Sequence, residues 1–416
     1  MTASASDGGR FNRLMAHPGF VRFLSARLAV SIAVQMQTVA VGWQIYAITR
    51  DPLDLGLIGL SQFLPFVLLV LPAGHVADRR NRAAILSFCY ALELLCALLL
   101  LAFTLSGLAV AWPVFAVMVL FGIARAFSMP AGQALLPNLV PPELFPRAVA
   151  VNSSTWQVST IAGPAIGGLV YLLGPHVVYA SVATLLAAAI VLMIGLRAPP
   201  PAVTTEPDSW HTLLEGLRFV WQRKIILGAV SLDLFAVLFG GATALLPAYA
   251  SDVLRIGPDG LGWLRAAPGV GAAFVAFAIA WSPIRRRVGT AMFAGVAVFG
   301  VATVVFGLSE NFLLSLVALT VLGGADMVSV YIRHMLVQLE TPDAIRGRVS
   351  AVNAVFIGAS NELGEFESGV TAAWWGLRPA VVVGGVASVA IAGLWMRFFP
   401  ALRHMKELPA RVVSAS

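Results

Sequence analysis

Three glutamates stand close together in an otherwise apolar part of the chain. Glu362, Glu365 and Glu367 lie in the stretch NELGEFESG, although only 11% of all residues are charged. On a helix, Glu362 and Glu365 share one face, whereas Glu367 is turned about 140° away from Glu362. Two close carboxylates in an apolar medium resist joint ionisation, so we expect Glu362 and Glu365 to hold a proton near neutral pH and to titrate together. The open alternative is that neighbouring helices pair all three glutamates as structure.

Other ionisable side chains also interrupt apolar runs. Asp233 lies roughly 13 Å of helical rise into its run, where a buried carboxylate is either neutral or charged beside an arginine, and either state allows proton exchange. The alternative for Asp233 is a fixed ion pair with Arg27 or Arg125. Asp326 and Arg333 are seven residues apart on one helical face, a position that favours a gate or a loop anchor.

Amide side chains gather in the first apolar run. Gln35, Gln37 and Gln44 lie near Trp43 in AVQMQTVAVGWQ, a mixture that suits a polar and aromatic pocket for a small molecule. Glutamines also form hydrogen bonds between membrane helices without binding a ligand. The sequence leaves these two interpretations open.

The composition indicates whether these side chains lie in a protein surrounded by water or by a lipid bilayer. Hydrophobic residues make up 59% of the 416 residues, above the apolar share of ordinary soluble domains, and mean hydropathy is +0.87. The apolar runs are continuous, which favours helices over the alternating pattern of membrane strands. Because about 20 apolar residues span a bilayer as helix, we predict an all-α membrane protein. Its twelve expected spans are at about 20–48, 54–77, 83–106, 110–133, 149–172, 175–197, 224–250, 259–282, 289–309, 312–336, 349–374 and 377–399.

The basic residues predict the orientation of these spans. Most of the 27 Lys and Arg residues fall in loops on the same side as both termini, so the positive-inside rule places both termini in the cytoplasm. The net charge of +7 follows from this topology and gives no support for nucleic-acid binding. The first run is too long for a signal-peptide core, and we expect it to be retained in a bacterial inner membrane.

The chain predicts two related halves. Residues 1–197 and 224–416 each hold six expected spans, separated by a polar cytoplasmic linker, residues 198–223, whose segment WHTLLEGLRFVW has the spacing of a surface helix. SMPAGQALLPNLVPPELFPRAVAVN (128–152) aligns without gaps with SVYIRHMLVQLETPDAIRGRVSAVN (329–353), and both end in R-x-x-A-V-N. A duplicated six-helix unit is typical of transporters whose halves rock about a central site.

A short loop after the second span carries a known pattern. GHVADRRNRAAIL (74–86) resembles the loop G-x-x-x-D-R-x-G-R of the major facilitator superfamily, with Gly74, Asp78, Arg79 and Arg82 in register. In that family the loop is implied to latch the cytoplasmic gate. Asn81 replaces the usual glycine, and asparagine tolerates the left-handed backbone that a tight turn can require. The alternative is that the arginines only anchor the topology.

Four further stretches resemble the same superfamily. STIAGPAIGG (159–168) is similar to its antiporter motif at Gly163, Pro164, Gly167 and Gly168, with Ser159 in place of the first glycine. That motif goes with exporters, and its small residues also serve close helix packing. RAFSMPAGQA resembles the arginine segment of the fourth span. The stretches IRHMLVQLETPDAIRGRVSAVN and NELGEFESG resemble the branch that includes enterobactin and macrolide exporters.

The resemblance implies a cavity and a function. In this superfamily, spans 1, 4, 7 and 10 line the central cavity. The resemblance therefore implies that the cavity is lined by Arg27, Arg125, Asp233 and Asp326. Glu93 lies on a span that is peripheral in this fold, so we expect it to have a structural partner. We expect a monomeric secondary transporter that exports a small amphipathic molecule, a siderophore or a drug, in exchange for protons. An importer or uniporter on the same fold is the first alternative, and a membrane-embedded enzyme or receptor is the second.

The sequence shows no pattern that points to enzyme chemistry, a metal or a cofactor. It has no GxxxxGK[ST] nucleotide loop and no His or Cys spacing for a metal site, so we expect a gradient to supply the energy of transport. Cys89 and Cys96 lie seven apart within one span and are expected to pack rather than to react.

Overall fold

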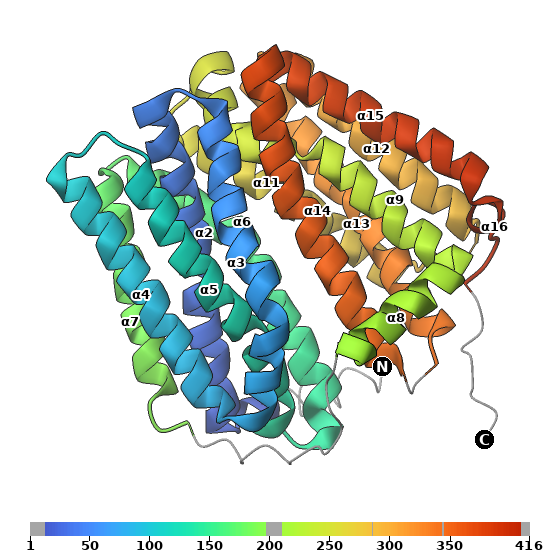
Figure 1. The fold of residues 1–416 in the computed structure, drawn as a ribbon, viewed down its shortest axis with the longest axis horizontal. Helices are drawn as coiled ribbons and strands as arrows, with labels where there is room; N and C mark the ends of the chain where they lie inside the picture. The colour runs from blue at the N-terminus through green and yellow to red at the C-terminus, as the bar shows by residue number, and fades with distance from the viewer. Residues whose placement is uncertain (1–12, 197–209, 285, 343–344, 409–416) are drawn as a thin grey trace. The chain divides into compact units, whose positions relative to one another are not determined.

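The computed structural model describes residues 13–196, 210–284, 286–342 and 345–408. Within these residues the chain is helical and has no strand (Figure 1), which confirms the predicted all-α class. The elements in chain order are α2 (Pro18–Thr49), α3 (Pro52–Arg79), α4 (Arg82–Ser106), α5 (Trp112–Leu135), η1 (Leu136–Leu139), η2 (Pro142–Leu144), α6 (Phe145–Tyr171), α7 (Pro175–Met193), α8 (Trp210–Gln222), α9 (Lys224–Gly240), η3 (Ala242–Leu245), α10 (Leu246–Ala248), η4 (Tyr249–Val253), α11 (Pro258–Trp281), α12 (Val288–Leu308), α13 (Phe312–Glu340), α14 (Arg346–Trp375), α15 (Leu377–Phe398) and α16 (Pro400–Arg403).

The helices have the length and surface of membrane spans. In the described part of the chain, 10 helices are long and apolar enough to cross a bilayer. Large apolar side chains lie on their outer surfaces, such as Phe274 and Trp281. The expected fifth and eleventh spans form as the long helices α6 and α14, which are not among those ten because their sequences are more polar. The count of twelve crossings therefore stays a prediction.

The chain packs as two compact units. The N-terminal unit comprises Met1–Thr49, Ser61–Glu206 and Gly257–Ala266, and the C-terminal unit comprises Arg50–Leu60, Pro207–Ile256 and Ala267–Ser416. The linker predicted at residues 198–223 lies largely outside the described residues, except for α8. This segment is the helix that its apolar spacing predicted.

Within the N-terminal unit, α2 packs against α6 and α7, and α4 packs against α5 and α7. Phe20, Phe23 and Tyr179 are completely buried, and Tyr90 is almost so. Cys89 and Cys96 are free and buried in α4, as expected for packing residues. Burial of these large apolar side chains against each other fixes the lateral order of the helices.

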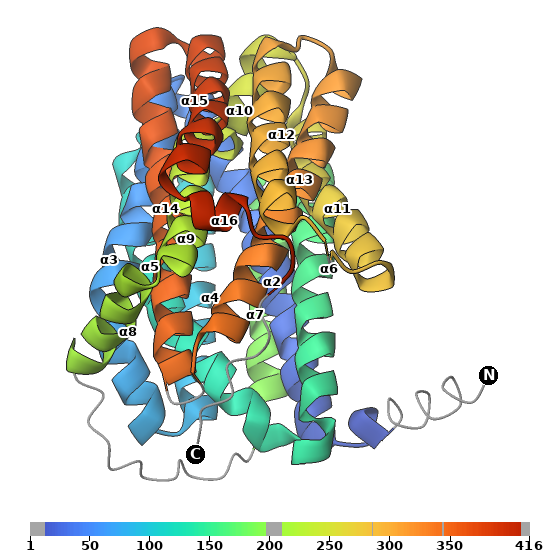
Figure 2. The same cartoon turned by 90° about the vertical axis from the view of Figure 1, so that its right-hand side faces the viewer.

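Within the C-terminal unit, α12 packs between α13 and α15, and α9 packs against α14 and α15. The core holds Leu232, Phe293 and Ile332. The amphipathic helix α8 lies against α9 and α14 (Figures 1 and 2). Val220 of α8 is buried and packs into a cluster with Ile226.

The expected span 224–250 is not one continuous helix. The α-helix α9 ends at Gly240, and the chain continues through the short helices η3 and α10 and the π-helical turn η4. Gly241 has φ −67° and ψ 38°, outside the α-helical range, and Pro247 has no backbone N–H to continue a ladder. Tyr249 secures the irregular segment, since its hydroxyl donates a hydrogen bond to the Gly307 carbonyl.

Candidate functional site

The C-terminal unit contains a buried ion pair between two of the candidate residues. Arg333 on α13 donates from its guanidinium to the Asp233 carboxylate on α9, and the side chains are 2% and 5% exposed. Sequence reasoning left open an ion pair of Asp233 with Arg27 or Arg125. The partner is Arg333 instead, because α9 and α13 pack against each other in this unit.

The surroundings of this pair are apolar. Arg333 is adjacent to Ile332, which belongs to a core cluster with Leu232 and Leu336. Among the described residues, Nε of Arg333 has no hydrogen-bond partner, whereas a terminal nitrogen of the same guanidinium pairs with Asp233. Removing one partner of such a pair typically costs about 3–5 kcal/mol, because the other charge is left buried and unpaired.

Asp326 lies on the same helix as Arg333, nearly two turns before it. Its side chain is half-buried, and α13 carries it in the C-terminal unit. The ion-pair partner of Arg333 is Asp233 on α9. The role of Asp326 as a gate residue therefore stays a prediction.

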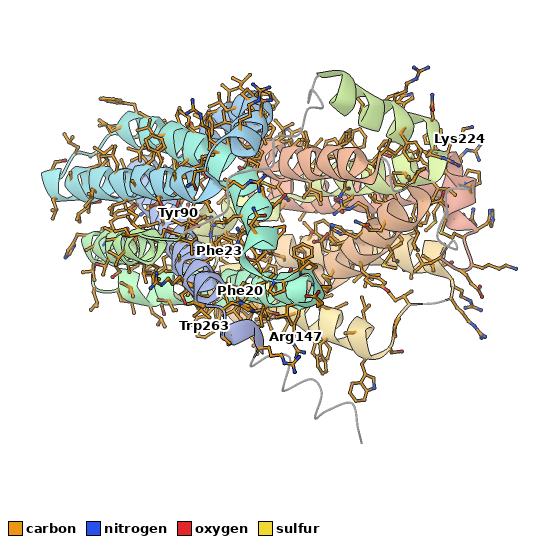
Figure 3. The ribbon with its side chains drawn as sticks, turned by 90° about the horizontal axis from the view of Figure 1, so that it is seen from below. Phe20, Phe23, Tyr90, Arg147, Lys224 and Trp263 are labelled. Atoms are coloured by element: carbon orange, nitrogen blue, oxygen red, sulfur yellow. The ribbon has the colours of Figure 1, made fainter. Side chains whose placement is uncertain are left out.

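The N-terminal unit buries a second group of ionisable residues. Glu93 on α4 is 2% exposed, and its Oε2 has no hydrogen-bond partner among the described residues. The charge of Arg125 on α5 acts on Glu93, and the charge of Arg27 on α2 acts on Tyr90, one turn before Glu93. The helices α2, α4 and α5 thus bring two arginines, an acid and a phenol together; Figure 3 labels Tyr90.

Aromatic rings support both arginines of this group. The guanidinium of Arg27 lies 6.0 Å from the centre of the Phe23 ring, and that of Arg125 lies 5.9 Å from the centre of the Phe66 ring. Such contacts stabilise a desolvated cation. Gly132 on α5 makes room for Arg27, since an added Cβ would lie 2.6 Å from the guanidinium.

The glutamines of α2 take different roles. Gln44 donates to the Thr104 hydroxyl at 3.0 Å and accepts from the Tyr179 hydroxyl at 2.7 Å, which links α2 to α4 and α7. Gln44 is therefore a structural residue in this structure. Gln37 is buried at 3% exposure. Gln35 is half-buried and lies against Gly163 of α6. A role in a ligand pocket therefore stays a prediction for Gln35 and Gln37.

The glutamates of α14 lie on a closely packed helix. Glu362, Glu365 and Glu367 are all half-buried. An added Cβ at Gly59 of α3 would lie 2.9 Å from Oε2 of Glu365, so this carboxylate rests directly on the α3 backbone. On another side of α14, Gly364 lies against the backbone of α9.

Asn81 ends the latch loop as the N-cap of the next helix. Asn81 has φ −63° and ψ 111° and caps α4, accepting from the backbone N–H groups of Ala83 and Ala84 at 3.0 and 3.3 Å. The backbone of Asn81 is extended rather than left-handed, because the residue serves as a helix N-cap, a role that asparagine fills well.

Arg82 ties this loop to the neighbouring helices. Its guanidinium donates to the carbonyls of Ala77 and Ala134, each at 3.2 Å, which connects the ends of α3 and α5. Arg79 is exposed, and Gly74 has open space at its Cα. The side chain of Asp78 lies outside what the structure describes.

The antiporter-type motif packs α6 against two partners. Added Cβ atoms at Gly163 and Gly167 would collide with Gln35 and with the backbone of Met36 on α2, and one at Gly168 would collide with the start of α11. The carbonyl of Pro164 approaches Gly262 of α11. Close packing is thus one function of all four positions.

No metal site can be built from the described residues. No group of three or more His, Cys, Asp or Glu side chains there could hold an ion.

The whole length of the chain carries a family signature. The profile of the transmembrane secretion effectors, a branch of the major facilitator superfamily, matches residues 14–413. The chain belongs to the major facilitator superfamily. The resemblance first found in short motifs is confirmed over nearly all of the sequence.

Relatives within the major facilitator superfamily include named exporters. The enterobactin exporter EntS of Escherichia coli (strain K12) is 25% identical over 410 residues, which cover 97% of each chain. The multidrug efflux pump Tap of Mycolicibacterium fortuitum is 27% identical over 400 residues, covering 92% of this chain and 96% of the pump. This chain is thus a membrane transporter of major facilitator type.

Solved structures share the major facilitator fold. A bacterial homologue of the human lysosomal transporter Spinster, inward-facing and occupied, has a TM-score of 0.72 at 15% identity, over 93% of this chain and 98% of that one. A D-xylose–proton symporter has a TM-score of 0.72 at 14% identity, over 94% and 99%. At this identity the likeness concerns the fold alone.

Proposed function

We propose that this protein is a proton-coupled exporter of a small amphipathic molecule, a siderophore or a drug, and works by alternating access. The observation that carries the proposal is that relatives aligned over nearly the whole chain are an enterobactin exporter and a multidrug efflux pump. On this proposal the protein is not an enzyme. It acts as a monomer in a bacterial inner membrane with both termini in the cytoplasm.

Each unit supplies charged groups for this activity. In the C-terminal unit, a proton that binds Asp233 would cancel its charge and release Arg333, because the pair depends on opposite charges. Glu362 and Glu365 supply a second protonatable pair. In the N-terminal unit, Arg27 and Arg125 present positive charge, with Gln35 and Gln37 as hydrogen-bonding groups on α2. A substrate with phenolate, carboxylate or amide groups suits such a lining.

The test of export uses intact cells. Cells that produce the protein are loaded with either enterobactin or the fluorescent cation ethidium, and the amount retained is followed over time. We expect faster loss of at least one compound than from cells that produce the Asp233→Asn and Arg333→Gln double variant, and we expect a protonophore to abolish the difference. Net accumulation by the producing cells would instead favour an importer.

A further inference from the structure

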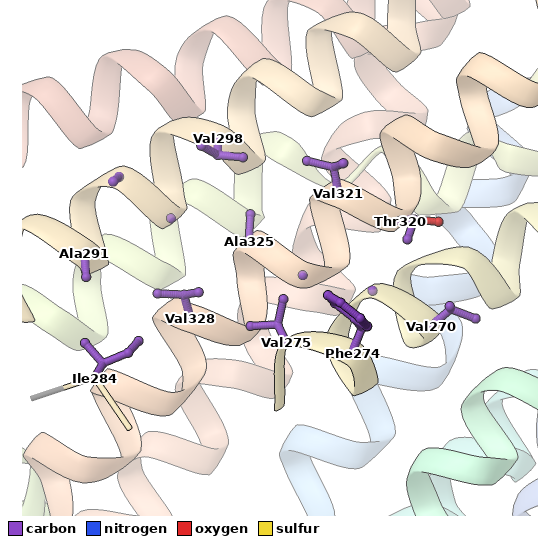
Figure 4. A pocket seen from close by; sticks show the side chains of 14 residues that line it. Val270, Phe274, Val275, Ile284, Ala291, Val298, Thr320, Val321, Ala325 and Val328 are labelled. Atoms are coloured by element: carbon purple, nitrogen blue, oxygen red, sulfur yellow. The ribbon is translucent and has the colours of Figure 1, made fainter. Parts of the chain in front are cut away.

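The C-terminal unit has an apolar groove that none of the candidate transport residues lines. It has a volume of about 710 Å³ and lies between α11, α12 and α13 (Figure 4). Val270 and Phe274 of α11 form one wall, and Ala294 and Val298 of α12 form the other. This groove is separate from the buried pair of Asp233 and Arg333, neither of which lines it.

Small residues on α13 form the floor of the groove. Gly324, Ala325 and Val328 lie there, and Gly295 of α12 adds to it. At one end, α11 approaches α13 closely, since an added Cβ at Gly271 would collide with the Thr320 carbonyl. The small side chains of Gly324 and Ala325 leave room between the two walls.

The lining offers almost nothing to a polar ligand. Thr320 is the one residue with a polar side chain among those that line the groove, and its hydroxyl already donates to the Leu316 carbonyl at 2.8 Å. The wall residues Phe274 and Val298 are 74% and 44% exposed, so the groove is open on its outer side. An open apolar channel on a membrane-spanning helix bundle fits a hydrocarbon chain.

One end of the groove reaches a basic loop. Ile284, which lines the groove, lies in the loop between α11 and α12, and Arg286 and Arg287 follow it, both exposed. Trp281 at the end of α11 is 85% exposed. Exposed tryptophan and arginine side chains are characteristic of the membrane–water interface, and basic groups beside transmembrane helices bind anionic headgroups.

We propose that this groove binds one anionic phospholipid, with an acyl chain along α13 and the phosphate beside Arg286 and Arg287. The position of the charges decides the orientation, because they stand at the Ile284 end of an otherwise uncharged channel. The lipid is a ligand that the protein keeps, distinct from the molecule it transports. The proposal does not depend on the identity or direction of the transported substrate.

Native mass spectrometry of the full-length protein tests this proposal. The protein is exchanged into detergent with equal amounts of phosphatidylglycerol and phosphatidylcholine, and the retained lipids are counted. Ala294→Trp fills the groove, and Val301→Trp is its matched control, an exposed position of the same helix that does not line the groove. We expect Ala294→Trp to lose one phosphatidylglycerol that both the wild type and Val301→Trp retain.

The headgroup site is tested by exposed variants that leave the packing intact. Arg286→Gln with Arg287→Asn should weaken phosphatidylglycerol binding roughly twenty-five-fold, because each basic residue near an anionic headgroup contributes about a factor of five. Asparagine suits position 287, where φ is 54°. Arg218→Gln on α8 is the control for the loss of an exposed arginine elsewhere, and it should leave binding unchanged.

Three outcomes would overturn the proposal. The first is equal phosphatidylglycerol retention by Ala294→Trp and the wild type, and the second is equal binding of the two lipids. The third is displacement of the lipid when ethidium is added to the wild-type protein, which would make the groove a path for substrate. Gel filtration of each variant as a single monodisperse peak ensures that a lost lipid is not a sign of unfolding.

Discussion

Asp233 on α9 and Arg333 on α13 form an ion pair in the interior of the C-terminal unit, although they are 100 residues apart in the chain. Both side chains are almost completely buried. The pair therefore holds two opposite charges at a place where either one alone would be costly. A proton delivered to Asp233 changes the charge of this unit and frees an arginine, which is the kind of event that coupling requires.

The first prediction concerns the stability of this pair. Asp233→Asn should lower the free energy of unfolding by about 3–5 kcal/mol, since it leaves Arg333 charged and unpaired. The combination with Arg333→Gln should recover most of that loss. Thermal denaturation followed by gel filtration measures both. As control, Asp252→Asn breaks the exposed pair with Arg50, whose atoms are 3.2 Å apart, and should cost less than about 1 kcal/mol.

Transport by the same double variant separates coupling from structure. If the pair takes part in coupling, the folded double variant should exchange substrate across the membrane but fail to accumulate it against a gradient. Gradient-driven accumulation at the wild-type rate by the double variant would reduce the pair to a structural role.

A second prediction concerns the latch. Asp78→Asn keeps the shape of the side chain and removes its charge, so the protein should fold and insert while transport slows about tenfold to a hundredfold, the contribution of one charge-assisted hydrogen bond. Glu143→Gln, which removes an exposed acid in another loop of the same unit, should transport normally. A normal transport rate from a well-produced Asp78→Asn protein would contradict the latch, and the loop would then only set the orientation of the helices in the membrane.

The third prediction concerns the glutamates of α14. Replacing both Glu362 and Glu365 with Gln should weaken the pH dependence of the transport rate, because glutamine cannot bind or release a proton. Glu367→Gln, on a different face of the helix, should have a smaller effect on transport than the double replacement. An active double variant with an unchanged profile would remove the two residues from the mechanism.

A fourth prediction follows from the duplicated stretch R-x-x-A-V-N. Asn152 on α6 and Asn353 on α14 occupy equivalent positions, and the Oδ1 atom of each is buried without a hydrogen-bond partner in the described parts of the chain. Such an acceptor costs about 1–3 kcal/mol if it stays unpaired. We expect it to gain a donor in another state of the transport cycle.

Leucine at these positions tests that expectation. Asn152→Leu and Asn353→Leu should keep or raise thermal stability, because they remove an unpaired amide, yet each should slow transport several-fold. The measurement compares melting temperature and initial transport rate for the two variants. A loss of stability in both would show that the amides already have partners in the resting state.

The sequence was sufficient for the features that depend on local chemistry. Continuous apolar runs predicted the long helices, and the motif residues from Gly74 to Gly168 identified the superfamily. The spacing of WHTLLEGLRFVW predicted α8. These features depend on neighbours in the chain, which is why periodicity and composition reveal them.

Features that depend on tertiary packing could not be predicted. The choice of Arg333 as the partner of Asp233 depends on how α9 meets α13, and the use of Gln44 as a link depends on the positions of Thr104 and Tyr179. The sequence showed that Asn81 stands where the family has glycine, but the role of Asn81 as the N-cap of α4 depends on the fold. Glu93 was visible as an acid within a span, and only the packing of α4 and α5 shows that it lies near Arg125.

The measurement that tests the central claim most directly is substrate movement in proteoliposomes with an imposed pH gradient. The purified full-length protein is reconstituted, enterobactin or ethidium is supplied outside, and the vesicle interior is made acidic relative to the bath. An exporter that exchanges substrate for protons should then accumulate the compound inside, with a matching rise in internal pH, and should stop when the gradient is collapsed. Accumulation that occurs instead when the bath is the acidic side, or that is equal with and without the gradient, would contradict proton-coupled export.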